Sequence, residues 1–350
     1  MAAPGTMLAA RLVGHGGPEA LELAEVPVPA PAEGEVLVRV GAAALNNTDL
    51  WTREGAYGLP GDPDARAGWR GPIRFPRIQG ADIAGVVVQV GSGSDAGLSG
   101  TRVLVDPAIY DRDDDDANPV GLLGSEKDGG YARYVAVRAD RVHDVGDSPL
   151  SDVELACLPT AYGTALGMLE RGGVRPGETV VVTGASGGVG LALVQLAAAR
   201  DARVIAVSSA GKLSAVRQAG AGAVIDRATD PWEQIASAAP GGVDAVLDVV
   251  AGSGIAAGLP SLREGGRWVV AGALGGYRID LDVRRLYLHN LTLLGSSMHT
   301  PAHFRALVDV ARQGRVRPVV AATYDLADVR RAQEDLASRQ HVGKLVLVND

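Results

Sequence analysis

A glycine-rich turn offers the clearest chemistry in the chain, and it reads Gly184-Ala185-Ser186-Gly187-Gly188-Val189-Gly190. The β-branched apolar run from Thr179 to Thr183 is typical of a strand buried in a parallel sheet, and Leu191 to Ala199 indicates a helix. Glycine lets the backbone turn sharply and approach a pyrophosphate, whose charge the free N–H groups and the dipole of the helix would meet. A second strand at Arg203 to Val207 completes a βαβ unit. The turn therefore predicts a dinucleotide site, with a plain strand-to-helix connection as the alternative.

The residues after the second strand bear on which nicotinamide cofactor would bind. Sites for NAD place an acid there, which accepts hydrogen bonds from both ribose hydroxyls and would repel a 2′-phosphate. In this chain the strand is followed by Ser208, Ser209 and Lys212. Because two hydroxyls and a lysine can bind a phosphate, NADPH is favoured over NADH. The alternative is that Ser208 caps the next helix and that Lys212 is a solvated surface charge.

Strands alternate with helical or glycine-bounded stretches from about Ser151 onward, which is the pattern of a parallel sheet. In such sheets the cofactor binds at the carboxyl ends of the strands. Two further strand ends are therefore expected to contact it: Val249, and the turn Ala271-Gly272-Ala273-Leu274. The second of these is expected near the nicotinamide half.

The part of the chain before about Ser151 has a different pattern, which predicts short strands separated by turns. The alternation of Val36, Val38 and Val40 predicts a strand with one face packed inward, within a β-rich, barrel-like domain. The strand expected at Lys344 to Val348 returns to this domain. We therefore expect an α/β protein with one domain of residues 7–150 and 300–350 and an inserted Rossmann domain of residues 151–299. The cleft between them would hold the site.

Composition excludes several classes of function. The 350 residues carry a formal net charge of -8, which opposes binding to nucleic acid. No apolar run approaches the roughly 20 residues of a membrane span, and no secretory leader is recognisable. A cytoplasmic protein is expected. The one cysteine, Cys157, excludes an internal disulfide and is read as a buried apolar residue.

Several further motifs follow one another along nearly the whole chain. They are Gly16 to Pro29, Asn46-Asn47-Thr48-Asp49 with Arg53 and Gly55, Gly80 to Gly85 with Val90-Gly91, Asp128 to Ala132, Gly177 to Ala198, and Gly343 to Val346. In this order they resemble the zinc-free branch of the medium-chain dehydrogenase/reductase superfamily, the quinone oxidoreductases and enone reductases. Val181 and Ala198 depart from the quinone oxidoreductase signature. The resemblance implies a GroES-like barrel plus a Rossmann domain, assembled as a homodimer through the Rossmann sheet.

The resemblance also bears on metal. Zinc-bearing relatives place their catalytic ligands at positions that here read Asn46, Ala81 and Thr160, and none of these is a good zinc ligand. Where such relatives hold a structural zinc, this chain has the acidic run Asp111 to Asp116. That run is read as a solvated loop, with a hard-cation site as the alternative. We expect no zinc.

Candidate catalytic residues come from the same resemblance. Asn46 would reach the nicotinamide pocket, Trp51 stands where relatives carry a tyrosine in the substrate wall, Tyr57 follows shortly after, and Thr164 would lie beside the nicotinamide ring. The alternatives are that Asn46 only bonds its own turn, that Trp51 is a core residue and that Thr164 is an ordinary helix residue.

The long loop between Ala56 and Ile78 could line the mouth of the cleft or be merely solvated. Its candidate substrate contacts are Arg66, Trp69, Arg70, Phe75 and Arg77.

Without zinc, the charge created by hydride transfer is best tolerated on a conjugated system. The sequence therefore favours an NADPH-dependent reductase of quinones or of the C=C bond of α,β-unsaturated carbonyl compounds. Two alternatives stay open. One is a metal-free carbonyl reductase or alcohol dehydrogenase, and the other is an NADPH-binding protein without catalysis.

Overall fold

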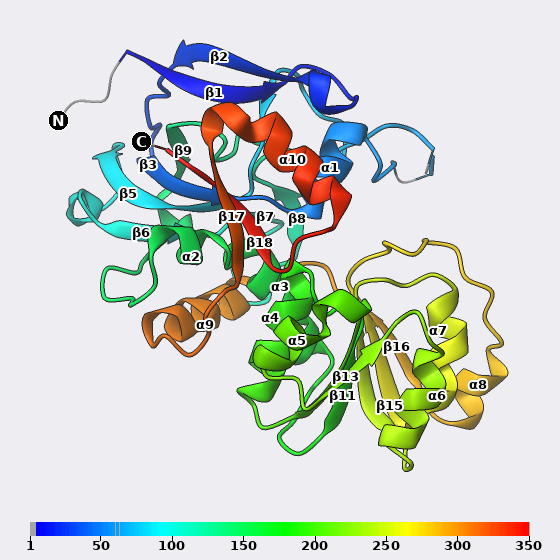
Figure 1. The fold of residues 1–350 in the computed structure, drawn as a ribbon. Helices are drawn as coiled ribbons and strands as arrows, with labels where there is room; N and C mark the ends of the chain where they lie inside the picture. Colours follow the sequence, from blue (N-terminus) through cyan, green and yellow to red (C-terminus); the bar gives the residue numbers. More distant parts are fainter. Residues whose placement is uncertain (1–4, 60, 63, 350) are drawn as a thin grey trace. The chain divides into compact units, whose positions relative to one another are not determined.

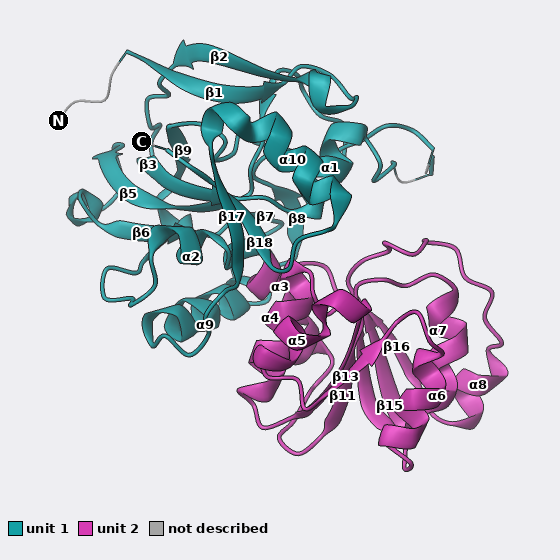
Figure 2. Cartoon of the chain, in the orientation of Figure 1, with its two compact units in different colours: residues 1–160, 300–350 teal, residues 161–299 magenta. Residues whose placement is uncertain are grey.

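The chain divides into two compact units, coloured separately in Figure 2. The structure is a computed structural model that describes residues 5–59, 61–62 and 64–349. The first unit comprises residues up to Thr160 and from Thr300 onward, and the second comprises Ala161 to His299. The short helix α2 (Asp152–Ala156) contacts two strands of the first unit and buries Leu155 there, so this unit extends beyond residue 150, where the sequence places its end.

The first unit is built mainly from antiparallel strands (Figure 1). Its largest sheet has the order β10-β6-β5-β3-β18-β17, with β9 also paired to β3, and smaller sheets have the orders β2-β1-β4 and β7-β8. The strands are β1 (Thr6–Leu12), β2 (Leu21–Pro27), β3 (Glu35–Ala44), β4 (Arg77–Ile78), β5 (Asp82–Val90), β6 (Arg102–Val105), β7 (Ala108–Tyr110), β8 (Pro119–Leu122), β9 (Tyr134–Arg138), β10 (Val142–Asp144), β17 (Val320–Asp325) and β18 (Lys344–Val348). The helices are α1 (Asn47–Glu54), α2, α9 (Pro301–Arg312) and α10 (Val329–Ser338).

Strand β3 is the centre of this unit, since it pairs with β5, β9 and β18. Val36, Val38 and Val40 are buried as the alternation predicts, but Leu37 on the opposite face is buried too. The predicted inward face is confirmed, and the opposite face is partly covered as well, since α2 packs on β3 while Arg39 stays exposed. Strand β18 runs antiparallel to β3, with Val346 opposite Ala44. The start of β18 therefore lies beside the residues that follow β3.

The second unit is a doubly wound Rossmann fold. Its six parallel strands have the order β13-β12-β11-β14-β15-β16, so the chain builds outward from β11 in one direction and then from β14 in the other. The strands are β11 (Thr179–Val182), β12 (Arg203–Ser208), β13 (Ala223–Asp226), β14 (Val243–Asp248), β15 (Leu262–Val270) and β16 (Thr292–Gly295). The helices are α3 (Pro159–Arg171, which begins in the first unit), α4 (Gly188–Ala198), α5 (Leu213–Gln218), α6 (Pro231–Ala238), α7 (Ser253–Gly258) and α8 (Arg284–Leu288). This order confirms the predicted parallel sheet.

The core of the second unit follows from this sheet. Apolar residues of several strands, such as Val181, Ile205 and Trp268, pack with Ile255 and Leu259 from the segment around α7. In the part of the chain that the structure describes, no helix has both the length and the apolar character needed to cross a bilayer.

Candidate active site

The glycine-rich turn joins β11 to α4. Gly184 has a φ of 59°, the left-handed region that favours glycine, and the N–H of Ala185 donates to the Val207 carbonyl over 3.1 Å. Helix α4 begins at Gly188, earlier than the predicted Leu191, and no side chain caps it at Gly187. Because the first N–H groups of a helix have no partner within the helix, the turn presents open donors to an anion.

Two glycines of this turn cannot be replaced without displacing a neighbouring group, which is backbone for Gly190 and a side chain for Gly184. A Cβ at Gly190 would lie 2.2 Å from the Gly184 oxygen and 2.6 Å from the Cα of Ala185. A Cβ at Gly184 would lie 2.9 Å from a methyl of Val249. Helix and strand are therefore as close as a phosphate-binding turn requires. Ser186, Gly187 and Val189 are partly or fully exposed along it.

At the end of β12, the hydroxyl of Ser208 is buried and has no hydrogen-bond partner among the described residues. Ser208 does not act as a helix cap, because Ser209 holds the cap position of the next turn and bonds nothing there through its side chain. Arg227, directly after β13, donates its backbone N–H to the Ser208 carbonyl over 2.8 Å. Partial burial and the charge of Arg227 both lower the pKa of Lys212.

One hydroxyl without a described partner, that of Ser208, thus lies near two cationic side chains, Lys212 and Arg227, where β12 and β13 end. These residues fit the 2′-phosphate of NADPH, and the uncapped α4 fits a pyrophosphate. Sequence reasoning missed Arg227. Arg227 could have been found from the sequence because it directly follows the strand after β12. Neighbouring parallel strands end at the same edge of the sheet, so the residues that follow them lie close together.

A second residue missed by sequence reasoning, Asp248, supports the other strand ends. Its carboxylate accepts hydrogen bonds from the Thr183 hydroxyl (2.5 Å), the Val250 and Ala251 N–H groups (2.8 and 3.0 Å) and the Trp268 indole (2.9 Å). Asp248 is only 2% exposed. It therefore fixes the turn that begins at Val249, whose own N–H donates to the Thr183 hydroxyl over 3.2 Å.

The turn formed by Ala271 to Leu274 lies against the one that follows Val249. The N–H of Ala271 donates to the Asp248 carbonyl over 2.9 Å, and that of Gly275 donates to the Val250 carbonyl over 2.7 Å. A Cβ at Gly272 would lie 2.7 Å from the Val249 oxygen. The structure therefore brings these two predicted segments together at the carboxyl edge of the sheet.

Thr164 lies on α3 and is buried. Its hydroxyl contacts the Met298 sulfur at 3.7 Å, and a thioether is a weak acceptor. The helix can approach this segment closely because neighbouring residues are glycines: a Cβ at Gly163 would lie 2.3 Å from the His299 ring, and one at Gly167 would lie 2.2 Å from the Met298 carbonyl.

In the first unit, Asn46 belongs to a buried polar cluster. Its side-chain amide donates to Asp82 Oδ2 over 2.9 Å and to the Ala44 carbonyl over 3.4 Å. Lys344 donates to Asn46 Oδ1, to the Leu45 carbonyl over 2.7 Å and to Asp82 Oδ2 over 3.2 Å. The backbone N–H of Thr160 donates to Asp82 Oδ1 over 2.7 Å. Both amide hydrogens of Asn46 are thus used within the cluster.

Asp49 borders this cluster from the first turn of α1. Its carboxylate accepts hydrogen bonds from the Asn46 N–H (2.7 Å) and the Tyr131 hydroxyl (2.8 Å). Burial raises the pKa of Asp49 to about 6, and the nearby charge of Asp82 adds to this effect. Burial, together with the charge of Asp49, also raises the pKa of Tyr131.

Trp51 and Tyr57 contact each other edge to face, with ring centroids 5.3 Å apart. The Tyr57 hydroxyl donates to Thr48 Oγ1 over 2.9 Å, and burial raises the pKa of this phenol above its ordinary value. Tyr57 therefore stays protonated at neutral pH. Trp51 is half-buried, so it is not a fully enclosed core residue.

The residues at the positions of zinc ligands in relatives do not fit zinc. Asn46 and Thr160 do meet at Asp82, but Ala81 offers no donor atom, and the Lys344 ammonium already occupies the oxygens of Asn46 and Asp82. Within the described residues, no group of three or more His, Cys, Asp or Glu side chains could hold a metal ion. Burial raises the pKa of Cys157 to about 12, so this thiol stays protonated.

Arginines neutralise the acidic run at Asp111 to Asp116. Arg112 pairs with Asp114 at 2.6 Å, and Arg305 pairs with Asp115 at 2.6 Å.

The later part of the loop between Ala56 and Ile78 is held by contacts with residues 125–128. The N–H groups of Trp69 and Arg70 donate hydrogen bonds of 2.9 Å to Ser125 and Glu126, respectively. Arg77 forms a 2.7 Å ion pair with Asp128. Arg66, Arg70 and Phe75 remain exposed.

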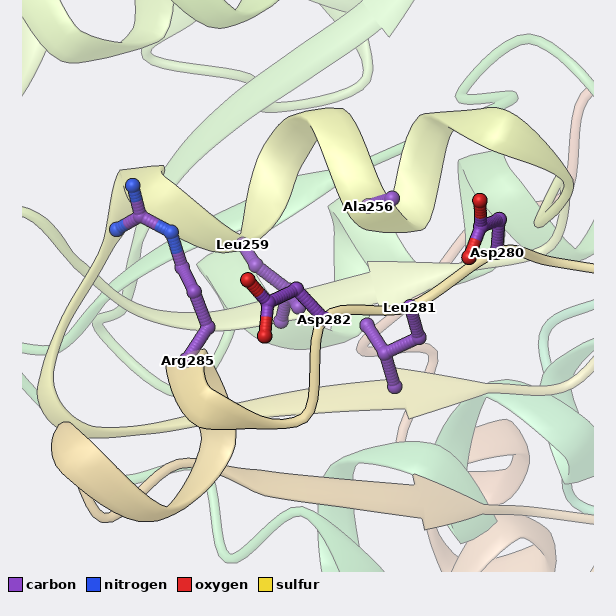
Figure 3. A pocket seen from close by; sticks show the side chains of 6 residues that line it. All are labelled: Ala256, Leu259, Asp280, Leu281, Asp282 and Arg285. Carbon is purple, nitrogen blue, oxygen red and sulfur yellow. The ribbon is translucent and has the colours of Figure 1, made fainter.

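The second unit has a cavity of about 300 Å³ beside α7. Figure 3 shows the residues that line it, which are both apolar and charged: Ala256, Leu259, Asp280, Leu281, Asp282 and Arg285. Asp282 is paired with Arg284 at 2.6 Å. No residue predicted to bind the cofactor lines this cavity, so it is not part of the candidate active site.

The Rossmann fold and its glycine-rich turn fit a dinucleotide-binding protein, and comparison with known proteins supplies the class. Residues 32–147 match the alcohol dehydrogenase GroES-like domain, and residues 188–313 match the zinc-binding dehydrogenase domain. The quinone oxidoreductase of Lama guanicoe is 32% identical over 98% of this chain and 97% of its own length. The acryloyl-coenzyme A reductase of Metallosphaera sedula is 28% identical over 96% and 98%. The chain belongs to the medium-chain dehydrogenase/reductase superfamily.

Solved structures agree on the fold, and one of them contains bound metal. A Sinorhizobium meliloti 1021 protein, provisionally described as an alcohol dehydrogenase, is 47% identical with a TM-score of 0.95, covering 99% of this chain and 98% of its own. A cobalt- and zinc-bound alcohol dehydrogenase from Pyrobaculum aerophilum is 32% identical with a TM-score of 0.85, covering 98% and 100%. Metal use therefore has to be argued from the residues of each chain.

Proposed function

We propose that this protein is an NADPH-dependent, metal-free reductase of quinones or of the C=C bond of α,β-unsaturated carbonyl compounds. The observation behind the cofactor assignment is the buried, unpartnered Ser208 hydroxyl beside Lys212 and Arg227. An acid that would repel a 2′-phosphate does not follow β12. The similarity to quinone and acryloyl-coenzyme A reductases supports the substrate class.

Bound NADPH would supply a hydride, and the chain would supply binding, orientation and charge stabilisation. Ser208, Lys212 and Arg227 would bind the 2′-phosphate, the open donors of α4 the pyrophosphate, and Val249 with Ala271 to Leu274 the nicotinamide half. Metal is dispensable in this proposal because negative charge arriving on a conjugated substrate spreads to an oxygen, which hydrogen-bond donors can stabilise.

The experiment is to mix the purified protein with NADPH or NADH and with panels of quinones, α,β-unsaturated ketones and saturated ketones. We expect NADPH consumption with the first two panels, a clear preference for NADPH, and full activity in excess chelator. Failure to reduce any quinone or enone would contradict the proposal. Turnover of saturated ketones alone would favour a carbonyl reductase, although the Tyr57 hydroxyl, whose hydrogen is already donated to Thr48, is poorly placed as its proton donor.

We also propose that two copies assemble through the edge of the second unit's sheet. Strand β16 is the outermost strand of the described sheet. Large apolar side chains near it in sequence are exposed: Tyr277 at 73%, Tyr287 at 65% and Leu288 at 62%. An exposed apolar group beside a free strand edge is typical of an interface between copies.

A further inference from the structure

The polar cluster around Asp82 is closed to ligands at nearly every atom. An ammonium has three N–H donors, and those of Lys344 are directed at the Leu45 carbonyl, Asn46 Oδ1 and Asp82 Oδ2. Both amide hydrogens of Asn46 are also used, and Asp82 accepts hydrogen bonds at each oxygen. Asn46, Asp82 and Lys344 therefore have no donor left for a substrate.

Thr160 is different. Its backbone N–H is held by Asp82 at 2.7 Å, which fixes the residue at the start of α3. Its side-chain hydroxyl is buried, with Thr160 only 8% exposed, and finds no hydrogen-bond partner within the described part of the chain. Buried hydroxyls nearly always have a partner, so a partner from outside the chain is expected.

The charges around this hydroxyl select the kind of partner. The carboxylate of Asp82 is paired with the Lys344 ammonium at 3.2 Å, so neither of these two charges is free to hold a charged ligand. The N-terminal end of α3 adds a partial positive charge at Thr160. A neutral oxygen that becomes more negative during the reaction fits these surroundings best, since it gains a hydrogen bond and a favourable dipole as its charge grows.

We propose that the Thr160 hydroxyl donates the hydrogen bond to the carbonyl oxygen of an α,β-unsaturated substrate, with Asn46, Asp82 and Lys344 as positioning residues. This inference rests on the proposed function. Hydride arrival at the β-carbon moves the C=C electron pair toward the carbonyl oxygen, and a proton from water completes the product at the α-carbon. Thr160 would stabilise the oxygen while it carries that charge. Asn46, which the sequence predicted to reach the nicotinamide pocket, becomes a positioning residue in this proposal.

The test compares Thr160→Val with Thr160→Ser. Valine keeps the shape and removes the hydroxyl, whereas serine keeps it. We expect kcat/KM for an enone to fall about 100-fold in Thr160→Val, the cost of losing one donor to a developing oxyanion, and to stay within about threefold in Thr160→Ser. The NADPH dissociation constant, measured by fluorescence titration, should not change in either variant. Thermal unfolding should not shift downward in Thr160→Val, because this hydroxyl has no partner to lose among the described residues.

The outcomes separate this inference from the proposed function. If the unaltered protein reduces enones and Thr160→Val reduces them equally well, the inference fails and the proposed function stands. If both variants lose activity together, or if Thr160→Val unfolds at a clearly lower temperature, Thr160 is structural and the inference also fails. If the unaltered protein reduces quinones but no enone, the inference fails and the proposed function stands. If it reduces neither, both are wrong.

Discussion

Two hydroxyl groups in this protein share an unusual state. Ser208 at the end of β12 and Thr160 at the start of α3 are buried, and neither side-chain oxygen has a partner among the described residues. Leaving such a group unsatisfied costs about 1–3 kcal/mol of stability. We interpret both as places where a ligand completes the hydrogen bonding, the first for a cofactor phosphate and the second for a substrate oxygen.

Replacing Arg227 tests the phosphate assignment. In Arg227→Ala the NADPH dissociation constant should rise about tenfold, or ~1.4 kcal/mol, because one charge-assisted contact to the 2′-phosphate is lost. Binding of NADH should be unchanged, since it lacks that phosphate. Fluorescence titration with both cofactors measures this difference. Arg217→Ala, a matched loss of charge in the last turn of α5, should bind both as before. Equal weakening of NADPH and NADH in Arg227→Ala would contradict the assignment.

Asp49 should make stability depend on pH. Burial raises its pKa to about 6 in the folded protein, above the ordinary 3.8. The contribution of Asp49 to the free energy of unfolding is therefore largest below about pH 4, and it is lost as the pH rises through about 6. Relative to Asp49→Asn, which cannot ionise, the free energy of unfolding of the unaltered protein should fall by ~3 kcal/mol between about pH 4 and pH 7. Urea unfolding of both proteins across this range measures the difference. A constant difference, or one of opposite sign, would show that Asp49 is not held protonated.

At the scale of the elements, the phosphate-binding turn depends on how closely β11 and α4 approach. In Gly190→Ala, a Cβ 2.2 Å from the Gly184 oxygen would force the backbone apart. We expect a loss of ~1–3 kcal/mol in stability and at least tenfold weaker NADPH binding.

Gly187→Ala is the matched control within the same turn. Its Cβ would lie 3.6 Å from the Gly184 oxygen, an ordinary contact, and its φ of -81° suits alanine. Calorimetry should therefore show a lowered melting temperature for Gly190→Ala only. Similar melting temperatures for the two variants would mean that close packing at Gly190 is not what shapes the turn.

At the scale of the whole molecule, the exposed apolar residues near β16 should decide assembly. In the double variant Tyr287→Asp and Leu288→Asp, two buried charges in the proposed interface would oppose association. Sedimentation should show the unaltered protein at twice the 35.9 kDa chain mass and the variant at the chain mass. Leu23→Asp, which changes an exposed apolar residue of the first unit, should leave assembly unchanged. A monomeric unaltered protein would contradict the homodimer.

The amino-acid sequence by itself determined the local features of this protein. Periodicity and glycine placement predicted the parallel sheet, the turn from Gly184 to Gly190 and the strand at Lys344–Val348. These features are set by neighbouring residues, because backbone preference and the direction of successive side chains act over a few positions. For the same reason, the absence of an acid after β12 could be read directly.

Only the tertiary structure decided which distant side chains meet. Asn46, Asp82, Thr160 and Lys344 form one cluster because β18 pairs beside β3, and no local pattern records that pairing. The register of neighbouring strands places Asp248 beside the turn after Val249 and Arg227 beside Ser208. Whether a hydroxyl is buried and unpartnered depends on everything packed around it. The sequence could therefore name Ser208 as a candidate but gave no reason to choose Thr160 over Asn46.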